Sequence, residues 1–277
     1  MRKKPLELCL YAAGAAAFGV FVRWLQLQIA FNEQDLPDKS FFNIAVPVLI
    51  GVIVIMFVRF VDAYRNGHCV LPEDVCGAFA NPGMLHKLVR IAAGAVMSVG
   101  GIVLLLQCET DRSAAFLCVL AAVGIVTGVS HPLLLSAANK GEPLNRRRVC
   151  FYSAMPILLF SVWLVTCYKI HSIDPVRWSY AIEIIACCVS IISFFRLAGF
   201  AFDQPSPWRS LFFTMLGAVM CAMCLADERY LGQQLMLVGA MLMQLQYAWI
   251  ICANLRREDG KPLNSEDVPN DGFERLR

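Results

Sequence analysis

Eight long apolar stretches constrain this chain more than any other feature. Each stretch has about 18 or more mostly apolar residues, enough for a helix to cross the roughly 30 Å hydrocarbon core of a bilayer. Only 16% of all residues are charged, and a soluble fold could not bury so many such stretches. The sequence therefore predicts an all-α polytopic membrane protein with eight transmembrane helices. The predicted spans are residues 6–30, 41–61, 88–106, 114–135, 149–168, 178–195, 210–226 and 230–253.

Basic residues are divided unevenly between the two sides of the predicted helix bundle. With eight spans both termini share one side, which carries 18 Lys and Arg residues against five on the other. The loops of membrane proteins that face the cytoplasm are enriched in Lys and Arg. The pattern predicts a multi-pass protein of the cell (inner) membrane with both termini in the cytoplasm.

The two halves of the chain repeat similar sequence patterns in the same order. Gly-Ala-Val-Met occurs at residues 94–97 and again at 217–220, and Gly-x-Pro-Leu-Asn follows both the fourth and the eighth stretch. This order favours two tandem four-helix units in parallel orientation, related by a pseudo-two-fold axis along the membrane normal. The predicted parts are a first unit at 1–145 with a long cytoplasmic loop at 62–83, a second unit at 146–254, and a flexible cytoplasmic tail at 255–277.

Two charged residues lie well inside predicted spans, Arg23 in the first and Glu183 in the sixth. At 1.5 Å per helical residue, both fall near the outer boundary of the membrane, in opposite halves. A charge in lipid costs several kcal/mol unless it is paired or reaches the interface. We therefore predict that Arg23 and Glu183 approach each other where the halves meet. The alternative is that Arg23 and Trp24 form an anchor at the membrane surface.

Four other polar residues occupy equivalent positions of the two halves, near the predicted inner ends of their helices. Arg59 is equivalent to Arg196, and His131 is equivalent to Gln246. Together they would line a polar cavity that is open to the cytoplasm and suited to an anionic ligand. The alternative is that the arginines simply extend to the membrane surface, as is common at helix ends.

The residues that could bind a metal ion do not form a familiar pattern. His68, Cys69, Cys76 and His86 share the predicted long loop and its edge, and all are of types that bind zinc. Adjacent residues such as His68 and Cys69 can rarely both reach one tetrahedral ion. We predict no metal site and no cofactor.

The twelve cysteines are interpreted mainly as small apolar residues, because most lie inside the predicted spans. Cys221 and Cys224 form a Cys-x-x-Cys sequence, but without the strand and helix context of a thioredoxin-like site. Packing in the core is the favoured interpretation of that pair. A disulfide among Cys108, Cys167 and one of Cys221 and Cys224, all predicted toward the outer side, stays open.

No motif of a catalytic site is found: the sequence has no Gly-rich phosphate loop, no HExxH and no carboxylates arranged for acid–base catalysis. The basic residues lack the interleaved aromatic residues of nucleic-acid binding. In overall plan, eight helices in two units resemble the membrane anchor subunits of respiratory oxidoreductases. That resemblance implies partner subunits on the cytoplasmic face.

Our leading hypothesis is therefore a non-enzymatic anchor or scaffold, or a membrane component of a larger complex, surrounded by the lipid bilayer. The alternative is a small-molecule or ion transporter with a site between the two halves. Few polar residues within the spans favour the scaffold, whereas a ligand bound between the halves would favour transport.

Overall fold

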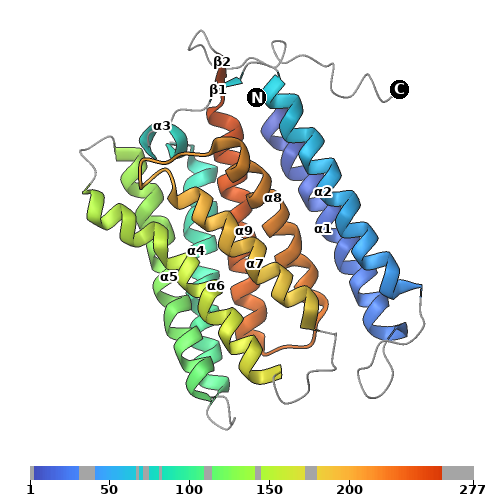
Figure 1. Ribbon diagram of the computed structural model, residues 1–277. Coiled ribbons are helices and arrows are strands. Elements are labelled where there is room, and N and C mark those ends of the chain that lie inside the picture. The colour runs from blue at the N-terminus through green and yellow to red at the C-terminus, as the bar shows by residue number, and fades with distance from the viewer. Residues whose placement is uncertain are drawn as a thin grey trace, which may run out of the picture.

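Long helices that lie side by side form the body of the protein (Figure 1). The computed structural model describes residues 3–30, 41–66, 69–70, 75–80, 83–108, 114–140, 145–171 and 180–257. Eight of its helices are long and apolar enough to cross a membrane, which confirms the predicted all-α polytopic fold. They are α1 (Lys3–Ile29), α2 (Phe42–Asn66), α4 (Met84–Gln107), α5 (Ala114–Lys140), α6 (Arg146–His171), α7 (Ala181–Ala198), α8 (Pro207–Met223) and α9 (Leu231–Asn254).

The six long helices from α4 to α9 pack in a closed ring that follows the order of the chain. Each of them contacts the next, and α9 also packs extensively against α4. The remaining two, α1 and α2, form a hairpin beside this ring (Figure 1). The hairpin contacts the ring through both of its helices: α1 packs against α8 and α9, and α2 packs against α8. The architecture is thus a six-helix ring with an N-terminal hairpin attached to its C-terminal helices.

Glycines allow α4 to lie very close to both of its neighbours in the ring. A Cβ atom added at Gly100 would lie 2.8 Å from the backbone nitrogen of Met236 in α9. A Cβ atom at Gly101 would lie 2.7 Å from the carbonyl oxygen of Ala121 in α5. Small residues let the backbones of membrane helices approach, which increases their van der Waals contact. The position of α4 between α5 and α9 is fixed in this way.

The predicted tandem repeat is only partly reflected in this packing. In favour of it, Gly94 of α4 faces α5, and the equivalent Gly217 of α8 faces α9. However, the extensive contact between α4 and α9 would have its equivalent between α5 and α8. Although both of those helices are fully described, they share no extensive contact. The structure does not confirm the repeat, which stays a prediction from the sequence.

Short elements cover one end of the ring. We call the end where α1 begins and α9 ends the proximal end, and the opposite end the distal end. A short helix, α3 (Val75–Phe79), packs against α5 and α9 at the proximal end. The side chain of Asn254 donates hydrogen bonds to the carbonyl oxygens of Ala78 (2.8 Å) and Ala80 (3.0 Å), which ties α3 to the end of α9.

The ring of Phe79 also packs α3 against the body of the protein. It is only 2% exposed and makes edge contacts with Phe200 and Tyr247, at centroid distances of 5.1 and 5.4 Å. Nearby, β1 (Cys69–Val70) pairs antiparallel with β2 (Arg256–Arg257). The sequence predicts only a loop at 62–83, so α3 and β1 are elements that the sequence interpretation missed.

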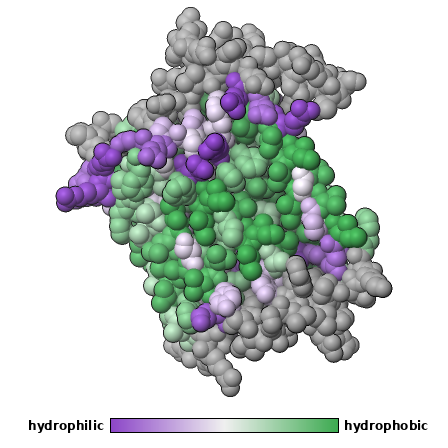
Figure 2. All heavy atoms as spheres, viewed as in Figure 1, coloured by the Kyte–Doolittle hydropathy of each residue, from purple (hydrophilic) through white to green (hydrophobic). Residues whose placement is uncertain are grey.

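The face of the bundle seen in Figure 2 is mostly apolar in its middle, and hydrophilic residues gather toward its two ends. On α2, for example, Ile44, Val48 and Val52 form a stripe that is more than half exposed. Such exposed apolar side chains are compatible with hydrocarbon as their surroundings. Together with the eight spanning helices, they identify the chain as an integral membrane protein.

Candidate functional site

A continuous network of polar side chains lies buried at the distal end, and we call it the distal charge network. At its centre, Nε and Nη2 of Arg23 each lie 2.9 Å from Oδ1 of Asp227. The other carboxylate oxygen of Asp227 lies 2.7 Å from Nη2 of Arg229, which also pairs with Glu183 through Nη1. The network consists of Gln26, Arg23, Asn43, Trp163, Glu183, Asp227 and Arg229.

Hydrogen bonds extend this network to helices on both sides. Arg23 Nη1 donates to Oε1 of Gln26 (2.6 Å), and Nε2 of Gln26 donates to Oδ1 of Asn43 on α2 (3.0 Å). At the other end, the indole nitrogen of Trp163 on α6 donates to Oε1 of Glu183 (2.7 Å). The network therefore joins both helices of the N-terminal hairpin to α6, α7 and the α8–α9 connection.

The four charged side chains of the network are nearly inaccessible and balance one another. Their side-chain exposures are 1% for Arg23, 11% for Asp227, 8% for Arg229 and 7% for Glu183. Burial of Arg229 lowers its pKa, but the carboxylates of Glu183 and Asp227 outweigh burial and raise the pKa above the ordinary value. Two cations facing two anions avoid the large cost of leaving a buried charge uncompensated.

The sequence prediction found the two ends of this ionic chain and missed its centre. It predicts that Arg23 and Glu183 approach each other, whereas the structure pairs Arg23 with Asp227 and Glu183 with Arg229, and the contact between Asp227 and Arg229 connects the two pairs. The predicted spans at 210–226 and 230–253 leave Asp227 and Arg229 in the short turn between them, on the outer side of the membrane. A loop residue that folds back into the bundle leaves no trace in the apolar pattern. The available signal was the shortness of the α8–α9 connection, which keeps its charges close to the helix ends.

A second polar group, the proximal polar cluster, consists of the side chains of His131, Gln246 and Tyr247 and the backbone carbonyl of His86. Nε2 of His131 lies 3.0 Å from Oε1 of Gln246, whose Nε2 donates to the carbonyl oxygen of His86 (2.9 Å). The ring of Tyr247 stands edge-on to His131, with centroids 5.3 Å apart. The other ring nitrogen of His131, Nδ1, is buried without a hydrogen-bond partner. The structure thus brings together His131 and Gln246, which the sequence had singled out as equivalents.

The two predicted arginines lie elsewhere. Arg59 is exposed on α2, and Arg196 is half-buried near the end of α7, with its guanidinium carbon 5.9 Å from the centroid of the Phe195 ring. Among the residues that the structure describes, no hydrogen bond or ion pair connects either arginine to His131 or Gln246. The contacts therefore bring together two of the four predicted residues, and the polar cavity stays a prediction from the sequence.

A third polar contact joins the three consecutive helices α7, α8 and α9. Nε2 of Gln244 on α9 donates to the hydroxyl of Ser190 on α7 (3.1 Å), and that hydroxyl lies 3.4 Å from the sulfur of Cys221 on α8. Oε1 of Gln244 and the hydroxyl of Ser193 are buried without hydrogen-bond partners. The interior of the ring thus contains polar atoms that could accept a hydrogen bond from water or a small solute.

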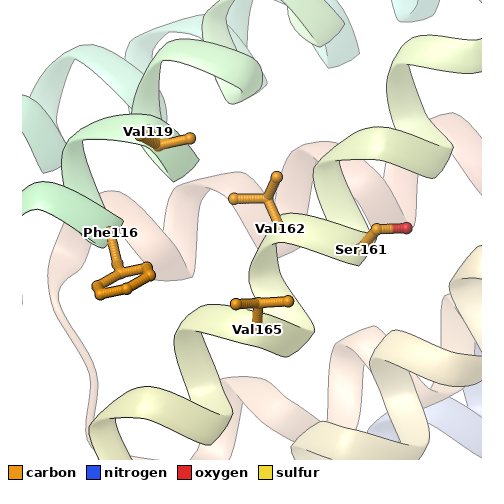
Figure 3. A pocket seen from close by; sticks show the side chains of 5 residues that line it. All are labelled: Phe116, Val119, Ser161, Val162 and Val165. Atoms are coloured by element: carbon orange, nitrogen blue, oxygen red, sulfur yellow. The ribbon is translucent and has the colours of Figure 1, made fainter.

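A hollow of about 340 Å³ lies between α5 and α6, toward their distal halves (Figure 3). Its walls are Phe116 and Val119 of α5 and Ser161, Val162 and Val165 of α6. The hydroxyl of Ser161 donates to the carbonyl oxygen of Ile157 within its own helix (2.8 Å). The walls therefore present almost only hydrocarbon and offer no group for chemistry.

Metal binding is tested only in part, because His68 and the side chain of Cys69 lie outside the described residues. Within the described part of the chain, no three His, Cys, Asp or Glu side chains gather as metal ligands would. No protein-family model, no curated protein and no solved structure matches the chain.

Proposed function

We propose that this chain is a non-enzymatic membrane scaffold of the cell (inner) membrane, with its proximal end in the cytoplasm, where it holds a partner protein. The observation that carries the proposal is the ion pair between Arg23 and Asp227. This ion pair fastens α1 of the N-terminal hairpin to the connection between α8 and α9, which contains Asp227. An anchor needs such a fixed relation between its helices, whereas a transporter needs parts that move.

The interlocked packing of the two halves supports the same proposal. The helices α1 and α2 lie on α8, and α4 lies tightly on α9. Alternating access works largely by rocking one repeat unit against the other. In this bundle, such a movement would have to break both the glycine-lined contact of α4 with α9 and a buried ionic chain.

The basic residues at the proximal end support the orientation. Arg146, Arg147 and Arg148 lie exposed in the first turn of α6, which has no acidic residue. Cations near the N-terminus of a helix are unfavourable because of the positive end of the helix dipole. Their position is better explained by the enrichment of basic residues in cytoplasmic loops, or by an acidic partner surface.

The transporter alternative has one observation in its favour. Buried polar atoms without partners occur at His131 and Gln244, inside the ring. A transported solute would use such atoms as hydrogen-bonding groups. In that case, binding of a solute should protect the ring interior from modification.

Photo-crosslinking in intact cells tests the scaffold directly. The photoreactive residue p-benzoylphenylalanine replaces either Met84 or Leu106, which lie at opposite ends of α4 and are 87% and 73% exposed. If a partner protein binds at the cytoplasmic end, we expect a discrete protein adduct from position 84 and none from position 106. Absence of a protein adduct at position 84, or an equal adduct at both positions, would contradict the proposal.

A further inference from the structure

Two cysteines from consecutive helices meet at the distal end. Cys108 follows the last residue of α4, and Cys118 lies in the second turn of α5. Their sulfur atoms are 3.2 Å apart. Cys108 is 1% exposed and Cys118 is half-buried, so the pair lies at the edge of the bundle with one thiol more accessible than the other.

The backbone of Cys108 is fixed at the end of α4, and its sulfur also lies 3.3 Å from the carbonyl oxygen of Leu105. The backbone N–H of Cys108 donates to the carbonyl oxygen of Leu104 (3.1 Å), which continues the helical pattern of α4. A disulfide bond is about 2.05 Å long, so the sulfur atoms need to move together by only about 1.2 Å. By contrast, Cys221 of the Cys-x-x-Cys sequence has its sulfur against the hydroxyl of Ser190.

We propose that Cys108 and Cys118 form a disulfide in the native protein. The inference rests on the proposed orientation, because disulfides form and persist outside the cytoplasm. The oxidant is a protein disulfide of that compartment. The thiolate of Cys118 attacks it and forms a mixed disulfide, and one sulfur of the oxidant leaves as a thiolate. The thiolate of Cys108 then attacks the sulfur of Cys118 and releases the second thiolate. The pair loses two electrons and two protons, and the oxidant becomes a dithiol.

The disulfide would strengthen the most tightly packed part of the ring. It would close the short connection between α4 and α5 at the distal end, and α4 is the helix held between α5 and α9 by its glycines. Cross-linking restricts the unfolded chain. Reduction of the purified protein should therefore lower its Tm by about 5–10 °C.

Thiol counting by intact mass tests the proposal. Full-length protein is taken from membranes, unfolded in SDS with N-ethylmaleimide and analysed without reductant. We expect ten adducts, two fewer than the 12 cysteines, and 12 adducts after reduction. The variants Cys108→Ser and Cys118→Ser should each give 11 adducts without reductant. The matched control Cys221→Ser should keep the deficit and give nine.

Two results would overturn the proposal: 12 adducts in the unreduced wild-type protein, or a deficit that persists in Cys108→Ser or Cys118→Ser. A separate measurement tells a failed disulfide from a failed orientation. In intact cells, a membrane-impermeant maleimide should not label the variant Arg147→Cys at its new thiol. If it does, the orientation is wrong; if it does not and the wild type has 12 adducts, only the disulfide is wrong.

Discussion

The distal charge network pairs two buried cations with two buried anions, whereas the proximal polar cluster joins an imidazole, an amide and a phenol ring. In the distal network, each charge has an ionic partner 2.9 Å away or closer. In the proximal cluster, one nitrogen of His131 remains without a partner. From this difference we expect the distal charge network to stabilise the bundle more than the proximal polar cluster. The distal charge network joins five parts of the chain by ionic contacts, whereas the proximal polar cluster connects three helices, α4, α5 and α9, by uncharged contacts.

The largest effect is expected from removing one cation of the distal network. Arg229→Met should leave the carboxylates of Glu183 and Asp227 without their shared partner. Breaking a buried ion pair in this way costs about 3–5 kcal/mol, so thermal unfolding in detergent should show a Tm lower by roughly 10 °C. The exposed Arg147→Met serves as the matched control and should change the Tm little. Equal Tm values for the two variants would contradict the expectation that the buried charge of Arg229 stabilises the protein more than the exposed charge of Arg147.

A smaller effect is expected at the proximal end. Gln246→Met removes the hydrogen bonds to His131 and to the carbonyl of His86, at a cost of about 1–2 kcal/mol. Gln244→Met on the same helix is the comparison: it removes a single hydrogen bond, from Nε2 to the hydroxyl of Ser190, together with a buried oxygen that has no partner. Its cost should be below about 1 kcal/mol. If Gln246→Met destabilised the protein as much as Arg229→Met, the two ends would not differ as described.

The smallest effect is expected for an ion pair at the surface. Arg146 and Asp203 lie 2.6 Å apart, but their side chains are 70% and 72% exposed. Exposed ion pairs contribute about 0–1 kcal/mol because water and salt screen them. Arg146→Ala should therefore leave the Tm almost unchanged at any salt concentration. A Tm decrease comparable to that of Arg229→Met would show that geometry alone, without burial, determines the strength of ion pairs in this protein.

The sequence predicted the eight helices because apolar length is a local property of the chain. The edges differed by a few residues, as at α4, which begins at Met84 instead of residue 88, since a helix can continue beyond its most apolar part. The closed ring and the hairpin beside it were not predicted. Helix order depends on contacts between distant segments, such as that of Gly100 with Met236, and no local pattern records which glycine faces which helix.

The candidate site was predicted in parts, for similar reasons. His131 and Gln246 were found because the predicted repeat aligns them with each other, and the structure places them in contact. Arg23 and Glu183 were found because a charge inside an apolar span is conspicuous. Asp227 and Arg229 were missed because charges in a loop are ordinary, and only the folded structure shows that this loop turns inward.

A double-mutant cycle at Arg23 and Asp227 tests most directly the claim that the distal charge network fastens the N-terminal hairpin to the ring. Arg23→Leu, Asp227→Leu and the double variant are compared with the wild type by thermal unfolding in detergent. Each single variant leaves a buried charge behind, so each should cost more than the double variant does, with a coupling of about 1–3 kcal/mol. Strictly additive costs would contradict the claim and would leave the ion pair without a part in holding the hairpin in place.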